Sequence, residues 1–529
     1  MRSKISCFNS TMVRHDIRRY WPLWAACLFF CVIFLPLFRL YNPGWSSFAS
    51  LTQNGWVLEL AVTAVFSALI AMAVFSPLYH TETSGFYAAL PVRREVWFAS
   101  AWLSGFFMLV GCALLTALLM FGVELSCGDV ELGETLLWVG KYILLTVFFY
   151  GLASLCALLT GTLWVVPLLY GVVNFIAYLL WVAVCYICEM LTTGWVSPED
   201  YLAVWLTPLL KISETEGKYE LWILILYAVL GLLFAALAFR IMKKRKMENA
   251  TDIVAVRVLK PLFRWAGGLC SGLFMGVILY AVFWDTSKGR TLQMMLFALV
   301  GVIVGWFGAE MLNRRSFKVW KKLPGFFLCA ALVLGFIFCC GNGCFGYESY
   351  IPKEDSIVRV ECDDYSRGWG VSSDREDIRA FVELHGDIRR KETEDGHTVD
   401  LTYTLKNGDK VKRRYTLRWE DFTAREQSLL LTMELNGLSE RIKQSADTGV
   451  WYWFAEWFDG TEYHSLKGDA KRFAELLMSA IQDGTLEHYQ GEADNVLEIY
   501  ADSYYDGRSS GYRFHVTEEG TERIRAYFD

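Results

Sequence analysis

Residues 56–98 read WVLELAVTAVFSALIAMAVFSPLYHTETSGFYAALPVRREVWF. Up to residue 78 the stretch is almost entirely apolar, and it is long enough to cross a lipid bilayer, which takes about 20 apolar residues. A short polar and basic connector follows, and the next apolar run begins at residue 97. Two such runs joined by a charged connector are typical of a polytopic membrane protein, so this stretch predicts the fold class.

The composition of the whole chain supports a helical membrane protein. Of the 529 residues, 54% are hydrophobic and 16% are aromatic, and the mean hydropathy is +0.31. These values exceed those of an average soluble chain. We predict about nine membrane spans, with a tight turn at residues 159–162 between the fourth and the fifth. The predicted spans cover residues 21–40, 56–78, 97–123, 137–160, 163–190, 221–240, 266–284, 292–312 and 324–344.

Lysine and arginine near helix ends predict the orientation, because they accumulate on the cytoplasmic side of a membrane. The N-terminus and the loops 79–96, 240–265 and 313–323 are rich in both residues, whereas the loop 124–136 is purely acidic. We therefore place the N-terminus in the cytoplasm. With nine crossings of the cell membrane, the C-terminal region lies outside.

Two shorter segments do not fit as spans. Residues Thr11–Tyr20 are basic and amphipathic, and we expect a helix that lies along the inner interface. Residues Tyr201–Leu210 are apolar but too short to cross, so we expect a re-entrant or outer-interface helix. The alternative for each segment is a flanking loop.

Several familiar motifs are missing from the chain. There is no Gly-x-x-x-x-Gly-Lys-Ser/Thr phosphate loop and no His-Glu-x-x-His zinc motif, and the seven histidines are scattered. Cys185 and Cys188 have zinc spacing but lie in an apolar segment without a second pair, which favours membrane packing. We therefore expect no enzyme activity, metal or bound cofactor in this chain, and no nucleic-acid partner. An external disulfide among Cys339, Cys340, Cys344 and Cys362 stays open.

The connector 78–98 has more features than a plain turn requires. Thr83 and Ser84 can cap a short helix, which the apolar residues 86–90 would continue. Pro91 would end it, because the residue before a proline avoids the helical conformation. Arg93 and Arg94 then offer a cationic face to the membrane or to a protein. The alternative is a basic anchor without a partner.

This connector, with His80 and the run LPVRREVWFAS, resembles the permease subunits of ABC-2-type ABC transporters. Two further loops are similar to a Gram-positive subgroup with extra spans and a C-terminal extracytoplasmic domain. These loops read KKRKMENATDIVAVRVLKPLFRW (243–265) and GAEMLNRRSFKVWKK (308–322). The resemblance implies a six-helix permease core with an N-terminal amphipathic helix at 1–240. It further implies a cytoplasmic connector with three additional spans at 241–345, and an extracytoplasmic domain at 346–529.

The resemblance also implies partners and contact residues. A separate ATP-binding subunit would hydrolyse Mg-ATP and dock on the loop 81–95, and a second permease half, identical or related, would complete the transporter. The residues that would couple to the ATPase are Glu82, Leu90, Pro91, Arg93 and Arg94. Cytoplasmic contacts would come from Lys243, Arg245, Glu248, Arg314 and Arg315. The expected function is that of an ATP-driven exporter.

The C-terminal region reads as a soluble α+β domain. Residues 402–418 alternate apolar and polar side chains around Asn407-Gly408, which is a strong hairpin signal. Helical spacing at 377–390 precedes this hairpin, and a similar order recurs with a helix at 469–483 and strands at 496–501 and 511–516. We therefore expect two related helix-plus-strand units, closed by a helix at 518–528.

An aromatic cluster in this domain has two interpretations. Trp451, Trp453 and Trp457 could contact lipid headgroups or a glycan on the outer surface. Alternatively they belong to a strand whose rings fill a core, which is the interpretation we favour.

The alternative to a permease is a membrane-bound envelope sensor, whose outer domain binds a ligand and signals to a cytoplasmic partner. A polytopic membrane enzyme is a third class, against which the scattered histidines argue.

Overall fold

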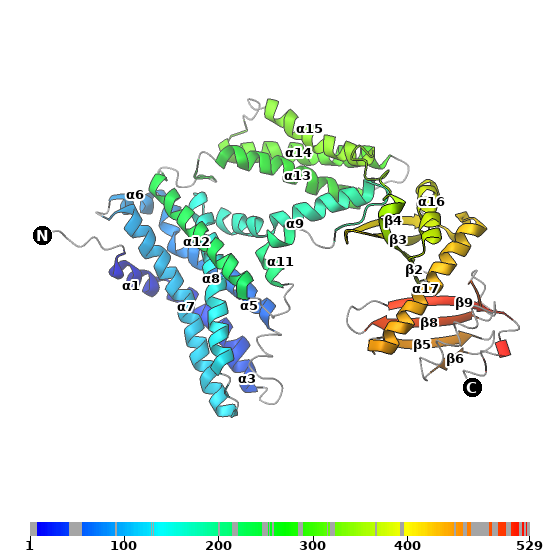
Figure 1. Ribbon diagram of the computed structural model, residues 1–529. Helices are drawn as coiled ribbons and strands as arrows, with labels where there is room; N and C mark the ends of the chain where they lie inside the picture. The colour runs from blue at the N-terminus through cyan, green and yellow to red at the C-terminus, as the bar shows by residue number, and fades with distance from the viewer. Residues whose placement is uncertain are drawn as a thin grey trace. The chain divides into compact units, whose positions relative to one another are not determined.

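The computed structural model describes residues 8–525 (Figure 1). Within this range the structure does not describe residues 42–54, 90–91, 129, 131, 199–201, 214–220, 246–251, 253, 257–258, 284–288, 315, 318–322, 365–367, 392–395, 449–450, 459–462, 467–485, 489–495, 504–508, 518–520 and 523–524. Within these bounds the chain forms two compact units. The first comprises Met1–Tyr186 and Glu199–Phe336, and the second Ile187–Pro198 and Ile337–Asp529.

The predicted spans are confirmed as helices. Among the described residues, nine helices are long and apolar enough to cross a membrane. The first combines α2 (Trp21–Val32), the π-helical turn η1 (Ile33–Leu37) and α3 (Phe38–Tyr41). The others are α5 (Trp56–Val74), α7 (Arg94–Cys127), α8 (Leu132–Leu159), α9 (Val165–Leu191), α12 (Leu221–Lys244), α13 (Leu259–Phe283), α14 (Arg290–Arg314) and α15 (Leu323–Gly341). The protein is therefore a multi-pass membrane protein with a C-terminal α+β region.

Helix α8 lies at the centre of the first bundle and packs against α5, α7 and α12. Glycines allow α8 and α12 to approach closely: a Cβ added to Gly151 would lie 2.2 Å from the carbonyl oxygen of Gly231. Small residues at helix contacts are typical of membrane bundles, since apolar side chains gain little from leaving lipid. This contact therefore sets the distance between the two spans.

Helices α13, α14 and α15 form a second group in the first unit and lie side by side (Figure 1). Here too the contact runs through glycine, because a Cβ on Gly305 would lie 2.2 Å from the carbonyl oxygen of Gly267. Trp306 of α14 is 1% exposed and packs near Gly268 of α13 and Gly325 of α15. The three additional spans thus share a packed interior.

The shorter segments follow the sequence expectations in part. Residues Ser10–Arg19 form α1, capped by the Asn9 side chain, and they pack against α7. In place of one helix at 201–210 there are two, α10 (Leu202–Trp205) and α11 (Pro208–Ser213). The break coincides with Pro208, since the residue before a proline is displaced from the helical conformation.

The expected turn between the fourth and fifth spans lies at residues 160–164. It is held by the segment after α12, because the Gly161 N–H donates to the carbonyl of Asp252 at 2.8 Å. The Ala255 N–H donates to the carbonyl of Leu159 at 2.9 Å. A connector far along the chain therefore fixes this turn.

The second unit contains two antiparallel sheets. The first has the order β2-β1-β3-β4, with β1 Ile357–Asp364, β2 Gly368–Ser372, β3 His397–Leu405 and β4 Lys410–Leu417. The second has the order β6-β5-β8-β9-β7, with β5 Trp451–Phe458, β6 Tyr463–Leu466, β7 Leu486–His488, β8 Val496–Ser503 and β9 Ser509–Val516. The expected hairpin is present: Thr404 pairs with Lys410, and Gly408 turns the chain with a φ of 86°.

The two sheets share one arrangement of hairpins. In the first sheet the hairpin β1-β2 is followed by the hairpin β3-β4, and β1 pairs with β3. In the second sheet the hairpin β5-β6 is followed by the hairpin β8-β9, and β5 pairs with β8. Helix α16 (Arg375–Lys391) connects the hairpins of the first sheet. The helix expected at 469–483 lies outside the described residues, as does most of the one expected at 518–528. Helix α17 (Ala424–Thr448) contacts β2 and β5.

The second unit also includes the end of α9 and the loop after it. The Thr193 N–H donates to Glu348 Oε1 at 3.2 Å, and the Arg414 N–H of β4 donates to the carbonyl of Gly194 at 3.4 Å. The cysteines that the structure describes are all free, so the external disulfide considered from the sequence is not formed among them. Cys340 instead lies 3.9 Å from Cys188, sulfur to sulfur, and Cys362 is buried in the core of the first sheet.

Candidate functional site

The predicted coupling segment forms helix α6 (Thr81–Ala89). Thr83 and Ser84 do not cap this helix, because it begins before them and the Thr83 hydroxyl donates to the carbonyls of Pro77 and His80, both at 3.2 Å. Glu82 is exposed in the first turn. Leu90 and Pro91 lie outside the described residues, so the expected helix stop at this proline stays a prediction.

Arg245, directly after α12, is the buried centre of this end of the bundle. Its side chain is 4% exposed. One terminal nitrogen, Nη1, donates to the carbonyl of Leu158 at 2.8 Å and lies 3.4 Å from that of Ala157, while Nη2 donates to the carbonyl of Leu78 at 3.4 Å. Two of these acceptors belong to the last turn of α8, whose carbonyls have no partner within the helix. A cation is favourable there because the helix dipole is negative at its C-terminus.

The segment after α6 reaches the same arginine. Arg94, in the first turn of α7, donates from Nη1 to the carbonyl oxygen of Arg245 at 2.8 Å. Next to it, Lys243 of α12 forms an ion pair with Glu95 at 2.9 Å, and both side chains are largely exposed. Two predicted coupling regions, one around α6 and one after α12, therefore meet here. Arg93 precedes α7 in an extended conformation and is exposed.

The electrostatics of this centre keep the guanidinium charged. Burial lowers the pKa of Arg245 to about 10, which leaves the side chain a cation at neutral pH. Tyr79 lies close by and donates its hydroxyl to the carbonyl of Ala157 at 3.2 Å, and burial raises the pKa of its phenol. The tyrosine therefore stays neutral and serves as a second donor to the end of α8.

Helix α1 packs beside this centre. The Ser104 hydroxyl of α7 donates to Asp16 Oδ2 at 3.4 Å, and Tyr20 and Ser76 are hydrogen-bonded through their hydroxyl groups at 3.0 Å. Burial raises the pKa of the Asp16 carboxyl, against the opposing effect of His15. The amphipathic segment is thus tied both to α7 and to the turn that precedes α6.

A second charged cluster lies between α13 and α14. Glu310 is 3% exposed and accepts hydrogen bonds from Arg264, at 3.0 Å, and from Arg314. Arg314, predicted from the sequence as a loop contact, is therefore held by a buried carboxylate. It belongs to this cluster, and among the described residues no hydrogen bond joins it to Arg245. Arg315 and Glu248 lie outside the described residues.

The aromatic cluster of the second unit is core where the structure describes it. Trp457 is fully buried and its ring stacks on His464, with the centroids 5.1 Å apart. The burial of Trp457 favours the core interpretation for this residue. The side chains of Trp451 and Trp453 lie outside what the structure describes.

The sequence interpretation missed Glu95, Tyr79 and the carbonyls of Leu78, Ala157 and Leu158. The Glu95–Lys243 pair joins segments that are distant in sequence, so no local pattern indicates it. Every residue has a backbone carbonyl, so the sequence does not indicate which carbonyls accept a hydrogen bond. The position of Arg245 in a basic run directly after an apolar span was visible in the sequence. At such a position a charged side chain is usually expected to extend to the membrane interface, so the sequence did not indicate its burial.

The Arg245 centre is a junction of backbone segments. Among the described residues, no group of three or more His, Cys, Asp and Glu side chains could hold a metal ion. The hydrogen bonds that Arg245 forms within the described part of the chain go to backbone carbonyls, not to a nucleophile with a neighbouring base. They join the segments on both sides of α6 to the ends of α8 and α12.

No protein-family model, curated protein or solved structure matches this chain. The functional assignment therefore depends on this geometry and on the short motifs of the sequence.

Proposed function

We propose that the protein is the permease subunit of an ATP-driven ABC transporter, driven from the cytoplasm by a separate ATP-binding subunit that docks on α6. The observation that carries this proposal is the Arg245 centre. Its guanidinium binds the Leu78 carbonyl before α6, and its carbonyl accepts from Arg94 after α6. A displacement of α6 would therefore act on spans two, three, four and six together.

The exposed side of α6 supports docking. Glu82 and Phe86 are one helical turn apart, and Phe86 is 64% exposed. Residues four apart share one helix face, so a partner would meet a carboxylate and an aromatic ring together. Arg93 would add a cation next to this face. The direction of transport, export, follows from the sequence resemblance alone.

A specific observation also favours the sensor alternative. The loop after α9 is hydrogen-bonded to β4 of the first sheet through Gly194–Arg414, and to the segment before that sheet through Thr193–Glu348. A ligand that shifted this sheet would act on the fifth span directly. In that case the cytoplasmic partner would be a regulator without ATPase activity.

The test is copurification of the tagged chain from its native host in mild detergent, with ATPase activity measured on the recovered complex. We expect a stoichiometric ATP-binding protein. The double variant Glu82→Arg with Phe86→Glu should remove that protein and the activity. It replaces a carboxylate of the docking face by a cation and an aromatic ring by a carboxylate.

The control is Glu134→Arg, a charge reversal on an exposed residue in the first turn of α8, the end opposite to the Arg245 centre. It should keep the partner. If the α6 double variant recovers the same complex with the same activity, α6 is not the docking site. If the parent chain is recovered with a regulator and no ATPase, the sensor function replaces the transporter.

A further inference from the structure

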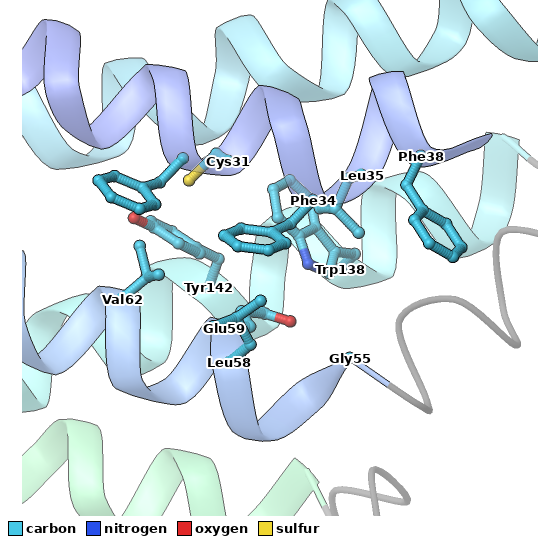
Figure 2. A pocket seen from close by; sticks show the side chains of 11 residues that line it. Cys31, Phe34, Leu35, Phe38, Gly55, Leu58, Glu59, Val62, Trp138 and Tyr142 are labelled. Carbon is cyan, nitrogen blue, oxygen red and sulfur yellow. The ribbon is translucent and has the colours of Figure 1, made fainter. Parts of the chain in front are cut away.

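A cavity of about 250 Å³ lies among the first, second and fourth spans (Figure 2). Its aromatic lining comes from Phe30, Phe34, Phe38, Trp138 and Tyr142, and its acidic group is Glu59. These residues belong to the last turns of the first span and the first turns of the second and fourth. The cavity is therefore near the ends of the three helices, opposite to the end that carries Arg245.

The backbone of the first span is widened where it borders the cavity. Residues Ile33–Leu37 form a π-helical turn that contains Pro36. Proline lacks the N–H that would continue the α-helical ladder, and π-helical turns inside α-helices are frequent at functional sites. The turn places Phe34 and Phe38 on the cavity wall (Figure 2).

Glu59 is the only carboxylate among the described residues that line this cavity. Its Oε1 is buried and accepts no hydrogen bond from the described part of the chain. In Figure 2 its side chain extends from α5 toward Trp138 on α8. Leaving a buried carboxylate oxygen without a partner is costly, so Oε1 can accept a hydrogen bond from a ligand or face a positive charge on it.

Two side chains of α8, Trp138 and Lys141, stabilise the charged form of Glu59. Lys141, about one turn beyond Trp138 on α8, is close enough to attract the carboxylate. It does not line the cavity, and Glu59 Oε1 has no hydrogen-bond partner among the described residues.

We propose that this cavity binds an organic cation, an ammonium group that carries small apolar substituents. Glu59 is its counter-ion, and the aromatic faces surround its apolar shell. Aromatic rings attract cations through their electron-rich faces, most strongly where water is excluded. An apolar ligand would leave Glu59 Oε1 without a hydrogen-bond partner, and an anion would be repelled, so neither matches the lining.

This inference names the substrate class of the transporter and rests on the proposed function for that role. Binding itself needs neither the ATP-binding subunit nor transport. The same chemistry occurs in a free quaternary ammonium compound and in the choline headgroup of a lipid, and the membrane composition separates the two sources.

The experiment compares benzyltrimethylammonium with neopentylbenzene, its uncharged carbon isostere, by equilibrium dialysis against the purified full chain in phosphatidylglycerol nanodiscs. We expect saturable binding of the cation. Glu59→Gln should weaken it at least about tenfold, because one member of a desolvated charge pair is lost, and should change binding of the isostere less than about threefold. Glu134→Gln, on an exposed carboxylate of α8, should leave both affinities unchanged.

Two further arms keep the inference open to refutation. Phe34→Leu keeps an apolar wall, so it should lower the ratio of cation to isostere affinity. Nanodiscs of phosphatidylcholine should compete with the added cation if the natural occupant is a lipid headgroup and leave its affinity unchanged if it is a free solute. Equal affinity of Glu59→Gln and parent for the cation, with both proteins monodisperse, overturns the cation site. It would leave the docking of an ATPase on α6 untouched.

Discussion

At the scale of single residues, Arg245 and Lys243 differ in the burial and the partners of their charged groups, although they are only two positions apart. The guanidinium of Arg245 is buried and binds backbone carbonyls of two other segments. The ammonium of Lys243 is largely exposed and pairs with Glu95. Hydrogen bonds from a charged donor contribute about 1.5–3 kcal/mol, whereas an exposed ion pair contributes about 0–1 kcal/mol. The two residues should therefore differ in their effect on stability.

We expect Arg245→Met to lower the free energy of unfolding by about 3 kcal/mol or more, because it leaves the end of α8 without its donor and removes a cation from the helix dipole. Lys243→Met, the matched control, should cost less than about 1 kcal/mol. Unfolding of the detergent-solubilised chain in a denaturing-detergent titration measures both. Equal loss in the two variants would show that Arg245 does not hold this end together.

At the scale of elements, the contact between α8 and α12 depends on glycine. A Cβ on Gly231 would lie 2.4 Å from the Cα of Phe148, so backbone meets backbone. No flexible side chain can move aside there, and the two helices must separate to admit even a methyl group. Overpacking of this kind typically costs about 1–3 kcal/mol.

Gly231→Ala should accordingly destabilise the protein by about 2 kcal/mol. Gly122→Ala on α7 is the control, since a Cβ there meets nothing within 4 Å and the change in helix propensity is the same. Denaturing-detergent titration of the two variants compares their free energies of unfolding. A destabilisation of Gly122→Ala as large as that of Gly231→Ala would argue against close packing of α8 on α12.

At the scale of the whole molecule, nine helices among the described residues are long and apolar enough to cross a membrane. Nine crossings would place the two termini on opposite sides. The basic loops favour a cytoplasmic N-terminus. Alkaline phosphatase is active only outside the cytoplasm and green fluorescent protein folds only within it under Sec export. We expect phosphatase activity from fusions at residue 130 and after Asp529, and fluorescence from a fusion at residue 246.

Fluorescence from the fusion at residue 246 and from a fusion after Asp529 would place both on the cytoplasmic side and would mean an even number of crossings after α12. In that case the C-terminal domain would face the cytoplasm, and its proposed role outside the membrane would be wrong. Fluorescence from the fusion at residue 130 would instead show that the first spans have the opposite orientation to the one we expect.

The amino-acid sequence by itself determined the nine spans, the amphipathic segment before them and the hairpin at Asn407-Gly408. Each of these follows from a local property: the length of an apolar run, a periodicity, or a dipeptide that accepts positive φ. It also indicated the repeated plan of the C-terminal sheets. The strand pairing then showed that each sheet contains two hairpins, to which the second sheet adds β7.

The tertiary structure alone decided which side chains meet. Arg245 is buried because the ends of α8 and of the segment before α6 converge on it. Trp457 is buried because His464 and Arg525 pack against its ring. Glu59 faces aromatic rings because a π-helical turn in another span borders the same cavity. None of these contacts is local in sequence. They depend on the packing of helices and strands, which a linear pattern of polarity does not specify.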